Sequence, residues 1–316
     1  MNKRQLGNTD LQFSPLVFGG NVLGWTIDQN KSFEVLDAFV DAGLTFIDTA
    51  DVYARWGDGN VGGESETVLG NWMKERGNRD KVIIATKVGS DMGQGKKDIS
   101  KAYISKAVEA SLKRLQTDYI DLYQTHWDDD TTPVEETLEA YTQLIKEGKV
   151  RFIGASNLSV ARLEASLKAS ADKRLARYES FQPEYNLYAR EGFEKEMQQA
   201  CIDSNLGVVT YFSLASGFLT GKYRDQLDKS KSIRGGSMDK YMNDRGFRIL
   251  DALDEVAKEH NVAPASVALA WLMERPGVTA PIASATSVEQ MNTLAAATHM
   301  SLTEADMGLL NTASAY

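Results

Sequence analysis

The sequence predicts an α/β fold in which a parallel β-sheet is covered by helices. Short β-rich runs alternate with longer runs of helical period along almost all of the 316 residues. The β-rich runs are continuously apolar, as strands buried on both faces are. Eight such units indicate a closed (β/α)8 barrel, the TIM barrel, rather than an open sheet. No internal linker interrupts the pattern, so we expect one domain spanning residues 1–316.

The expected strands are short and rich in branched and aromatic residues. They cover residues 16–20, 44–48, 81–87, 118–126, 150–156, 178–182, 206–213 and 277–283. Ahead of the first strand, the turn sequence GNTD at residues 7–10 lies between two apolar stretches and predicts a β-hairpin. We expect this hairpin to plug the N-terminal end of the barrel.

The expected helices follow the strands. They cover residues 31–42, 64–75, 101–115, 133–147, 159–170, 191–205, 245–259 and 264–275, with a further helix after residue 287 and a tail helix after residue 301. Gly43 and Gly148 stand where a left-handed residue ends a helix, and Ser100 stands where a side chain caps one. A long polar segment at residues 219–243 predicts a lid or binding loop after the seventh strand.

Two helix starts carry more specific signals. Thr132 and Pro133 predict a cap followed by a proline in the first helical position. Ser287 and Gln290 have the spacing of a capping box, in which each side chain bonds the other residue's backbone amide.

Composition excludes several classes of function. A formal charge of −9 without a basic run argues against a nucleic-acid or anionic-membrane surface. The N-terminus lacks the apolar core of a signal peptide, and no apolar run reaches the length of a membrane span. The single cysteine, Cys201, predicts a reducing compartment and an inert core position. We therefore expect a cytoplasmic protein, and we predict no metal site.

One glycine motif resembles a nucleotide fingerprint but lies in the wrong place. Residues 57–62, GDGNVG, match G-x-G-x-x-G and precede a helix. In a dinucleotide fold these glycines follow a strand immediately, so that the pyrophosphate meets the helix N-terminus. Here the strand ends at Asp48, well before Gly57. We interpret the segment as a flexible rim loop.

Catalytic groups in such a barrel stand at the C-terminal ends of the strands. Three neighbouring strand ends present Asp48 with Tyr53 just beyond it, Lys87, and His126. Each alone is readily explained as a turn cap, a rim aromatic, a solvated charge or a core histidine. Together they are hard to explain as packing, because a buried aspartate and lysine need one another.

This quartet predicts a specific chemistry. Tyrosine is a poor acid near neutral pH, and a nearby ammonium favours the phenolate and lowers the phenol pKa. We expect Asp48 to hold Lys87, Tyr53 to donate a proton, and His126 to orient a substrate carbonyl. No protein nucleophile is evident, so a hydride from a nicotinamide would complete the reaction.

The motifs at these positions resemble those of the aldo-keto reductase superfamily. Over nearly the whole chain the order is DTADVY, GGESETVLG, ATKVG, YQTHW, GASN, QPEYN and LTGKY. The resemblance implies a (β/α)8 barrel, NADP(H), and reduction of aldehydes and ketones. It assigns Tyr53 as the general acid, Asp48 and Lys87 as the pair that tunes its pKa, and His126 as the residue that orients the carbonyl.

The resemblance also implies a cofactor site. Ser156, Asn157 and Gln182 match the positions that bind the nicotinamide carboxamide, and Tyr211 matches the aromatic residue that stacks on the nicotinamide. The loop expected to cover the pyrophosphate includes Ser213, Leu214, Gly217, Thr220, Gly221 and Lys222.

Two departures from the family pattern affect the cofactor site. The loop after strand seven reads YFSL and lacks the usual proline. The segment after strand eight lacks the usual basic residue for a 2′-phosphate, and Ser284, Thr286 and the helix start near Ser287 and Gln290 stand there instead. We expect NADP(H), with NAD(H) possible.

The pocket wall is expected to be aromatic. Trp25 and Trp127 closely follow strand ends and are expected to face substrate, together with Trp56 and with Tyr241 from the long loop. Such a wall suits apolar or aromatic aldehydes.

Two alternative functions remain open. Some family relatives are channel-associated β subunits that hold NADPH and turn over slowly, but those usually carry an additional N-terminal segment. A Schiff-base lyase would use Lys87 as a nucleophile, which requires a lysine without a tight carboxylate partner. The sequence does not indicate the physiological substrate, the oligomeric state or the direction of the reaction.

Overall fold

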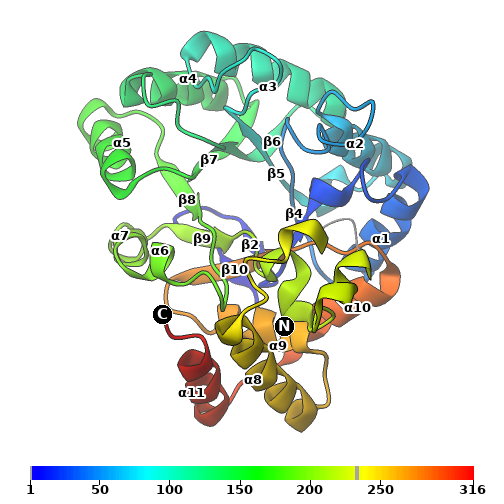
Figure 1. Cartoon of the computed structure of the whole chain (residues 1–316). Helices are drawn as coiled ribbons and strands as arrows, with labels where there is room; N and C mark the ends of the chain where they lie inside the picture. Colours follow the sequence, from blue (N-terminus) through cyan, green and yellow to red (C-terminus); the bar gives the residue numbers. More distant parts are fainter. Residues whose placement is uncertain (1, 232–234) are drawn as a thin grey trace.

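Eight parallel strands close into a barrel within residues 2–231 and 235–316, the ranges that the computed structural model describes (Figure 1). The barrel prediction is confirmed. The order around the barrel follows the sequence and closes where β10 pairs with β3. The strands are β3 Val17–Gly19, β4 Phe46–Asp48, β5 Ile83–Val88, β6 Ile120–Thr125, β7 Val150–Ser156, β8 Tyr178–Gln182, β9 Gly207–Thr210 and β10 Val278–Ala283.

Helices surround the barrel and lie between successive strands (Figure 1). They are α1 Gln29–Asp41, α2 Glu64–Arg76, α3 Lys101–Leu115, α4 Val134–Lys146, α5 Val160–Lys173, α6 Glu191–Glu194, α7 Met197–Asp203, α8 Asp244–His260, α9 Pro264–Met273, α10 Val288–Ala296 and α11 Glu304–Ala313. The bounds of α3, β7 and β8 match the predicted ranges, and most of the others differ by one to three residues.

Several predicted helix ends have the expected local chemistry. The Ser100 side chain accepts a hydrogen bond from the Tyr103 amide at the start of α3. Gly43 and Gly148 have φ values of +76° and +73°, which lie in the left-handed region that a glycine adopts without steric cost. These residues end α1 and α4 as predicted.

The predicted start of α4 is wrong. Pro133 is itself the N-cap, and the helix begins at Val134. The Thr132 hydroxyl does not cap the helix because it donates to the Asp129 carboxylate, at 2.6 Å, which also accepts the Thr132 amide. The aspartate organises the turn before the helix, and no side chain of the described residues caps α4.

The single helix predicted at residues 191–205 is also wrong. It is divided into α6 and α7, because Glu196 leaves the helical region with a φ of −135°. The break lets Met197 and Cys201 turn into the core, while Glu194 stays beside Arg190. Burial raises the pKa of the Cys201 thiol to about 12, in agreement with an inert core residue.

The capping box predicted at α10 is half formed. The Ser287 side chain accepts from the Gln290 amide, as expected. The Gln290 side chain, however, accepts from the Thr286 amide and hydroxyl at 2.9 and 3.0 Å, instead of from the amide of Ser287. Gln290 therefore fixes the turn between β10 and the helix.

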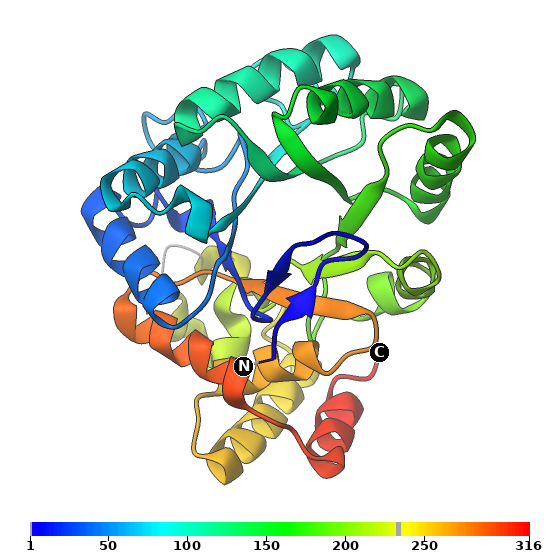
Figure 2. The same cartoon turned by 180° about the vertical axis from the view of Figure 1, so that it is seen from behind.

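The predicted hairpin is present and lies across one opening of the barrel (Figure 2). Its strands are β1 Arg4–Gln5 and β2 Gln12–Phe13. Leu6, Leu11 and Phe13 pack against inward-facing strand residues, and the Phe13 ring meets Phe46 edge to face at 4.7 Å. The hairpin thus plugs the N-terminal end, as predicted, and seals it with apolar side chains.

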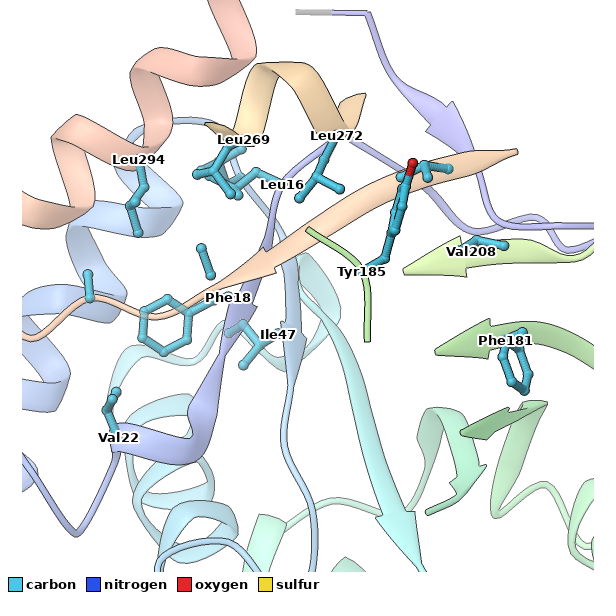
Figure 3. Packing of buried hydrophobic residues seen from close by; sticks show 14 of the residues in the cluster. Leu16, Phe18, Val22, Ile47, Phe181, Tyr185, Val208, Leu269, Leu272 and Leu294 are labelled. Carbon is cyan, nitrogen blue, oxygen red and sulfur yellow. The ribbon is translucent and has the colours of Figure 1, made fainter. Parts of the chain in front are cut away.

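The larger apolar layer lies between the strands and the outer helices (Figure 3). Phe18 and Ile47 point outward from neighbouring strands, while Leu269 and Leu294 come from α9 and α10. Strand residues therefore alternate between this outer layer and the barrel interior, in keeping with the two-residue period of a strand.

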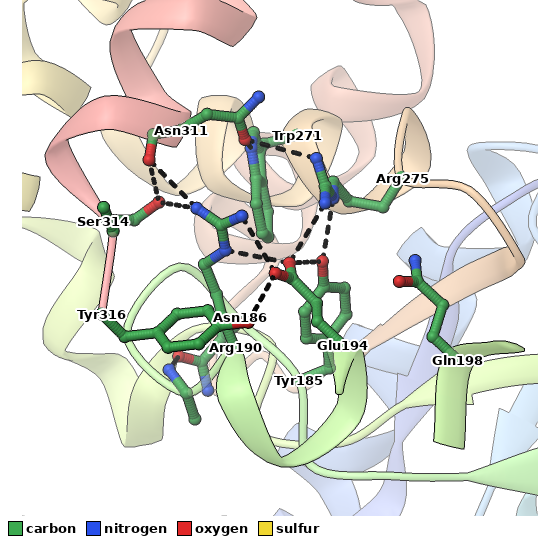
Figure 4. Close-up of polar contacts among 12 residues, drawn as sticks. Tyr185, Asn186, Arg190, Glu194, Gln198, Trp271, Arg275, Asn311, Ser314 and Tyr316 are labelled. Atoms are coloured by element: carbon green, nitrogen blue, oxygen red, sulfur yellow. Dashed lines mark hydrogen bonds and ion pairs between the residues drawn. The ribbon is translucent and has the colours of Figure 1, made fainter. Parts of the chain in front are cut away.

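A partly buried polar network fastens the C-terminal helix to the barrel (Figure 4). The Glu194 carboxylate accepts from Arg190 at 2.9 Å, from Arg275 at 3.1 Å and from the Tyr185 hydroxyl at 2.6 Å. Arg190 also donates to the Asn311 carbonyl on α11. Burial raises the pKa of Glu194, but the hydrogen bonds from Arg190 and Tyr185 and the charges of the two arginines outweigh it, and the pKa lies below its ordinary value. The stability drawn from Glu194 is therefore lost as pH falls.

The segment after β9 contains short 3₁₀ turns, η3 Ala215–Thr220, η4 Gln226–Lys231 and η5 Gly235–Ser237. The part of the predicted long loop at residues 232–234 lies outside the described residues. Among the described helices none combines the length and apolar character that a membrane crossing requires.

Candidate active site

The barrel interior changes from apolar to polar along the strands. Residues two apart on one strand face the same way, so an apolar residue near the hairpin is followed by a polar residue one layer higher. The pairs are Phe46 and Asp48, Ala85 and Lys87, and Leu122 and Gln124. The C-terminal end of the barrel therefore has a polar floor above a sealed apolar plug.

Lys87 is the centre of this floor and has no exposed surface. Its Nζ donates to Asp48 Oδ2 at 2.5 Å and to the Thr49 carbonyl at 3.0 Å. It also lies 2.9 Å from the Tyr53 hydroxyl. The predicted triad of aspartate, lysine and tyrosine is thus brought together by hydrogen bonds.

The second oxygen of Asp48 is held by two amides. Asp48 Oδ1 accepts from Gln124 Nε2 at 3.0 Å and from Gln182 Nε2 at 2.9 Å. A buried carboxylate is stable only when such partners satisfy it. The orientation of Asp48, and through it that of Lys87, is therefore determined from three separate strands.

His126 lies beside Tyr53, with 5.9 Å between the ring centroids. Its Nδ1 lies 3.0 Å from the Ser90 hydroxyl, and its carbonyl accepts from Asn157 Nδ2 at 3.0 Å. Asn157 Oδ1 in turn accepts from the Tyr211 hydroxyl at 2.9 Å. One hydrogen-bonded chain thus joins His126 to Asn157 and Tyr211, two of the predicted cofactor-binding residues.

The electrostatics differ from the expectation at Tyr53. Burial raises the pKa of the Tyr53 phenol above its ordinary value, and the Lys87 ammonium only partly offsets this. Burial lowers the pKa of Lys87, but Asp48 and Tyr53 outweigh it and the pKa is raised. Burial and then Lys87 lower the pKa of His126 well below its ordinary value. At neutral pH the floor holds a phenol, an ammonium and a neutral imidazole.

A cavity of about 1050 Å³ opens above this floor. Asp48, Tyr53 and His126 line it, with Lys87 directly behind them. The predicted cofactor-binding residues on its wall are Ser156, Asn157, Gln182, Tyr211, Ser213, Leu214, Gly217, Thr220, Lys222, Ser284, Thr286 and Gln290. Trp25, Trp56 and Trp127 line it as predicted.

Two predicted positions lie outside the cavity wall. Gly221 ends η3 with a φ of +78° and serves the turn. Tyr241 is buried against Phe218, with 5.4 Å between the ring centroids, and does not reach the pocket. Tyr241 packs inward because Phe218 and Tyr188 provide it with an aromatic site.

Known proteins match the chain over nearly its whole length. The sequence profile described as "Aldo/keto reductase family" matches residues 15–315. The chain belongs to this family. The aldo-keto reductase YhdN of Bacillus subtilis (strain 168) is 33% identical, over 99% of this chain and 93% of its own length. From the same organism, the uncharacterized oxidoreductase YrpG is 34% identical, over 98% of this chain and 95% of its own.

A relative that is described by a different role also matches. A protein of Oryza sativa subsp. japonica, described as a probable voltage-gated potassium channel subunit beta, is 33% identical over 92% of this chain and 89% of its own. Family membership makes the present protein an NAD(P)H-dependent oxidoreductase.

The glycine motif of this reductase does not form a phosphate site. The amides of Val61 and Gly62 donate to the Glu64 carboxylate, at 2.7 and 3.0 Å. Asn60 ties the loop to the Gly24 carbonyl at 2.9 Å. A carboxylate already occupies the place that a phosphate would need, in agreement with a rim loop.

Sequence reasoning missed Gln124, Ser90, Phe212 and Glu184. Gln124 had a signal, because it is an amide within an apolar strand, two residues before His126 and on the same face. No signal in the sequence identified Ser90, because its contact with His126 joins two loops that are distant in the chain. Phe212 and Glu184 line the cavity next to Tyr211, and Phe212 has a left-handed φ of +51° in the loop that lacks the proline.

The geometry disfavours a Schiff-base lyase. A nucleophilic lysine must lose its proton. Lys87 donates to a carboxylate at 2.5 Å, and its pKa lies above its ordinary value. This lysine is therefore held as an ammonium.

Proposed function

We propose that this protein reduces aldehydes and ketones to alcohols with NADPH, and that Tyr53 is the general acid. One observation carries the proposal. A fully buried ammonium, Lys87, bridges the Asp48 carboxylate and the Tyr53 hydroxyl at the floor of the large cavity. In this arrangement the Tyr53 phenol lines the cavity and Lys87 lies behind it, so the phenol is the proton donor that can contact the substrate.

The raised pKa of Tyr53 is compatible with this role. An acid must hold its proton until the carbonyl oxygen gains charge, and a buried phenol does so at neutral pH. Once the proton moves to that oxygen, negative charge develops on the phenolate. The Lys87 ammonium, 2.9 Å away, is already positioned to stabilise it. Lys87 thus acts on the transition state more than on the resting acid.

His126 supplies the second contact with the carbonyl oxygen. The imidazole is neutral and lies beside Tyr53 on the cavity wall. A neutral ring offers one N–H donor. We assign this donor to orienting the carbonyl, so that the Tyr53 proton and the carbonyl oxygen are aligned.

The residues on the wall fit a nicotinamide dinucleotide. Gln182 Nε2 is bonded to Asp48, which leaves its carbonyl oxygen for a carboxamide N–H. We assign the carboxamide to Ser156, Asn157 and Gln182, and the ring face to Tyr211. When bound, the cofactor supplies a hydride to the carbonyl carbon.

The distal part of the wall suits phosphates. Lys222 and Gly217 line the cavity, and a Cβ at Gly217 would lie 3.7 Å from Lys222 Nζ. Ser284 and Thr286 also line the cavity. We assign the pyrophosphate to Gly217 and Lys222, with Ser213 and Leu214, and the 2′-phosphate to Ser284, Thr286 and Gln290.

The tryptophans suit flat, apolar carbonyl compounds. The Trp25 and Trp56 rings meet edge to face at 5.5 Å, and Trp127 stacks on His126 at 6.0 Å. Trp56 is 49% exposed and Trp127 is 37% exposed, so both have ring surface left for a ligand. We propose apolar or aromatic aldehydes as substrates, in the cytoplasm, where Cys201 remains a free thiol.

The test is NADPH oxidation with 4-nitrobenzaldehyde by wild type and by Tyr53→Phe. The variant keeps the ring but loses the proton, so we expect kcat to fall by about 10² to 10⁴. NADPH affinity, followed by fluorescence, should be unchanged. Tyr119→Phe, before β6 at the other end of the barrel, is the matched control and should retain activity. Running NADH in parallel determines the cofactor preference.

Two results would contradict the proposal. Full turnover by Tyr53→Phe would eliminate Tyr53 as the acid. Tight NADPH binding without turnover by wild type would favour the second candidate, a sensing subunit, which the similarity to the rice protein described as a channel β subunit supports.

A further inference from the structure

Ser90 is a polar contact of the site that the sequence did not reveal. It is 6% exposed and lies in the loop after β5, three residues beyond Lys87. Its hydroxyl lies 3.0 Å from His126 Nδ1. Among the described residues, neither the Ser90 hydroxyl nor His126 Nδ1 has another hydrogen-bond partner. His126 lines the cavity, whereas Ser90 does not.

The loop that carries Ser90 is held against the histidine from several directions. Gly89 has a φ of +111°, and a Cβ there would lie 2.7 Å from Ile99 Cγ2 and 3.1 Å from the Trp127 carbonyl. The His126 amide donates to the Val88 carbonyl at 2.8 Å. Since glycine alone fits this close approach, the backbone on either side of Ser90 has little freedom.

A side chain within the same loop adds a further restraint. Gln94 Nε2 donates to the Ser90 carbonyl and to the Lys96 carbonyl, both at 2.9 Å. The Gln94 oxygen accepts the Met92 amide at 2.8 Å. The side-chain amide of Gln94 therefore spans the loop and holds the Ser90 backbone, which keeps the Ser90 hydroxyl directed at the His126 imidazole.

The donors and acceptors of the Ser90 hydroxyl and the His126 ring then indicate which ring nitrogen carries the proton. A neutral imidazole has one N–H and one lone pair, and the neutral form is the one present here. A serine hydroxyl buried next to Nδ1 is satisfied when it donates its proton to that nitrogen. Nδ1 is then the acceptor, and the ring proton must lie on Nε2.

We propose that Ser90 is a positioning residue that selects the Nε2–H tautomer of His126. This inference rests on the proposed function, because it explains how His126 presents a donor to a carbonyl oxygen. The other tautomer would turn a lone pair toward that oxygen and repel it. Ser90 thus acts on the substrate through His126, without touching the substrate itself.

The first test is ¹⁵N NMR of the histidine side chains, which needs no turnover. The chain has three histidines, so His126 is assigned by comparison with His126→Asn. In wild type we expect Nε2 to give the shift of a protonated ring nitrogen and Nδ1 that of an unprotonated one. In Ser90→Ala the two shifts should converge as both tautomers become populated, and Ser90→Thr should restore the separation.

Kinetics provide the second test. Loss of tautomer control in Ser90→Ala should lower kcat/KM for the aldehyde roughly 2- to 13-fold, the range expected for one hydrogen bond. NADPH affinity should not change. Ser105→Ala, which removes an exposed hydroxyl on α3 that bonds only its own helix, is the matched control and should behave as wild type.

Two NMR results would overturn the inference. One is a wild-type His126 protonated on Nδ1, and the other is an unchanged tautomer in Ser90→Ala. Because both are read without substrate, they are distinct from a failure of the proposed reaction, which would appear as absent turnover with the Nε2–H tautomer intact.

Discussion

Lys87 shows how a single residue organises the site. Its ammonium is fully buried and is stable there because Asp48, Thr49 and Tyr53 all contact it. Burial alone would lower the pKa of Lys87, but Asp48 and Tyr53 outweigh it, and burial raises the pKa of the Tyr53 phenol. Both groups are therefore protonated at rest, and the function of Tyr53 as an acid depends on charge that develops during the reaction.

Asp51, in the same loop, is a contrasting case. It is 2% exposed, and neither carboxylate oxygen has a hydrogen-bond partner among the described residues. Burial, and then the nearby Glu66, raise the pKa of Asp51 well above its ordinary value. Its folded pKa exceeds its unfolded pKa, so stability falls as pH rises between the two.

Replacing Asp51 by Asn tests this directly. The amide keeps the shape without a charge, so Asp51→Asn should raise the urea midpoint of unfolding at pH 7, and the gain should shrink as pH approaches 4. Asp58→Asn, in the exposed rim loop, is the control and should leave the midpoint unchanged at both values. A gain of equal size at pH 4 and pH 7 would contradict the argument.

At the scale of elements, close helix packing requires a small residue in α2. A Cβ at Gly70 would lie 2.2 Å from the Arg114 carbonyl oxygen and 2.8 Å from the Leu115 carbonyl carbon, both backbone atoms of α3. Gly308 in α11 meets no atom within 4 Å of such a Cβ. The same substitution should therefore have opposite effects in the two helices.

Urea unfolding of Gly70→Ala and Gly308→Ala measures this difference. Gly70→Ala should lose about 1–3 kcal/mol of unfolding free energy, because α2 must move away from α3. Gly308→Ala should gain about 0.5–1 kcal/mol, because alanine is the better helix former. A Gly70→Ala variant as stable as wild type would show that the two helices can separate without cost.

At the scale of the whole molecule, stability and chemistry occupy opposite ends of the barrel. The hairpin seals the N-terminal end with Leu6, Leu11 and Phe13. The cavity and its polar floor lie at the C-terminal end. A defect in the plug should therefore weaken the fold while leaving the reacting groups in place.

Phe13→Ala tests this separation. Phe13 is fully buried against Phe46, so its truncation should cost about 3–5 kcal/mol in urea unfolding. The kcat of the folded variant should stay within twofold of wild type, an order-of-magnitude expectation for a cavity remote from the site. The exposed neighbour Gln12 provides the control variant, Gln12→Ala. A large loss of kcat in folded Phe13→Ala would show that the plug is coupled to the site.

The sequence by itself determined the barrel, the plug and the presence of Asp48, Lys87 and His126 at neighbouring strand ends. These follow from local rules: strand and helix periods, Gly43 and Ser100 at helix ends, and the position of Asp48 and Lys87 at the C-terminal ends of strands. Each rule acts within a few residues, so it can be read without knowing what lies across the molecule.

Only the tertiary structure decided the contacts between distant segments. The bond from Gln182 to Asp48 joins residues 134 apart, and that from Ser90 to His126 joins residues 36 apart. The break between α6 and α7 and the raised pKa of Tyr53 depend in the same way on partners and burial that the chain acquires on folding. Hydrogen bonding and desolvation act between neighbours in space, and the spacing of residues along the sequence does not specify those neighbours.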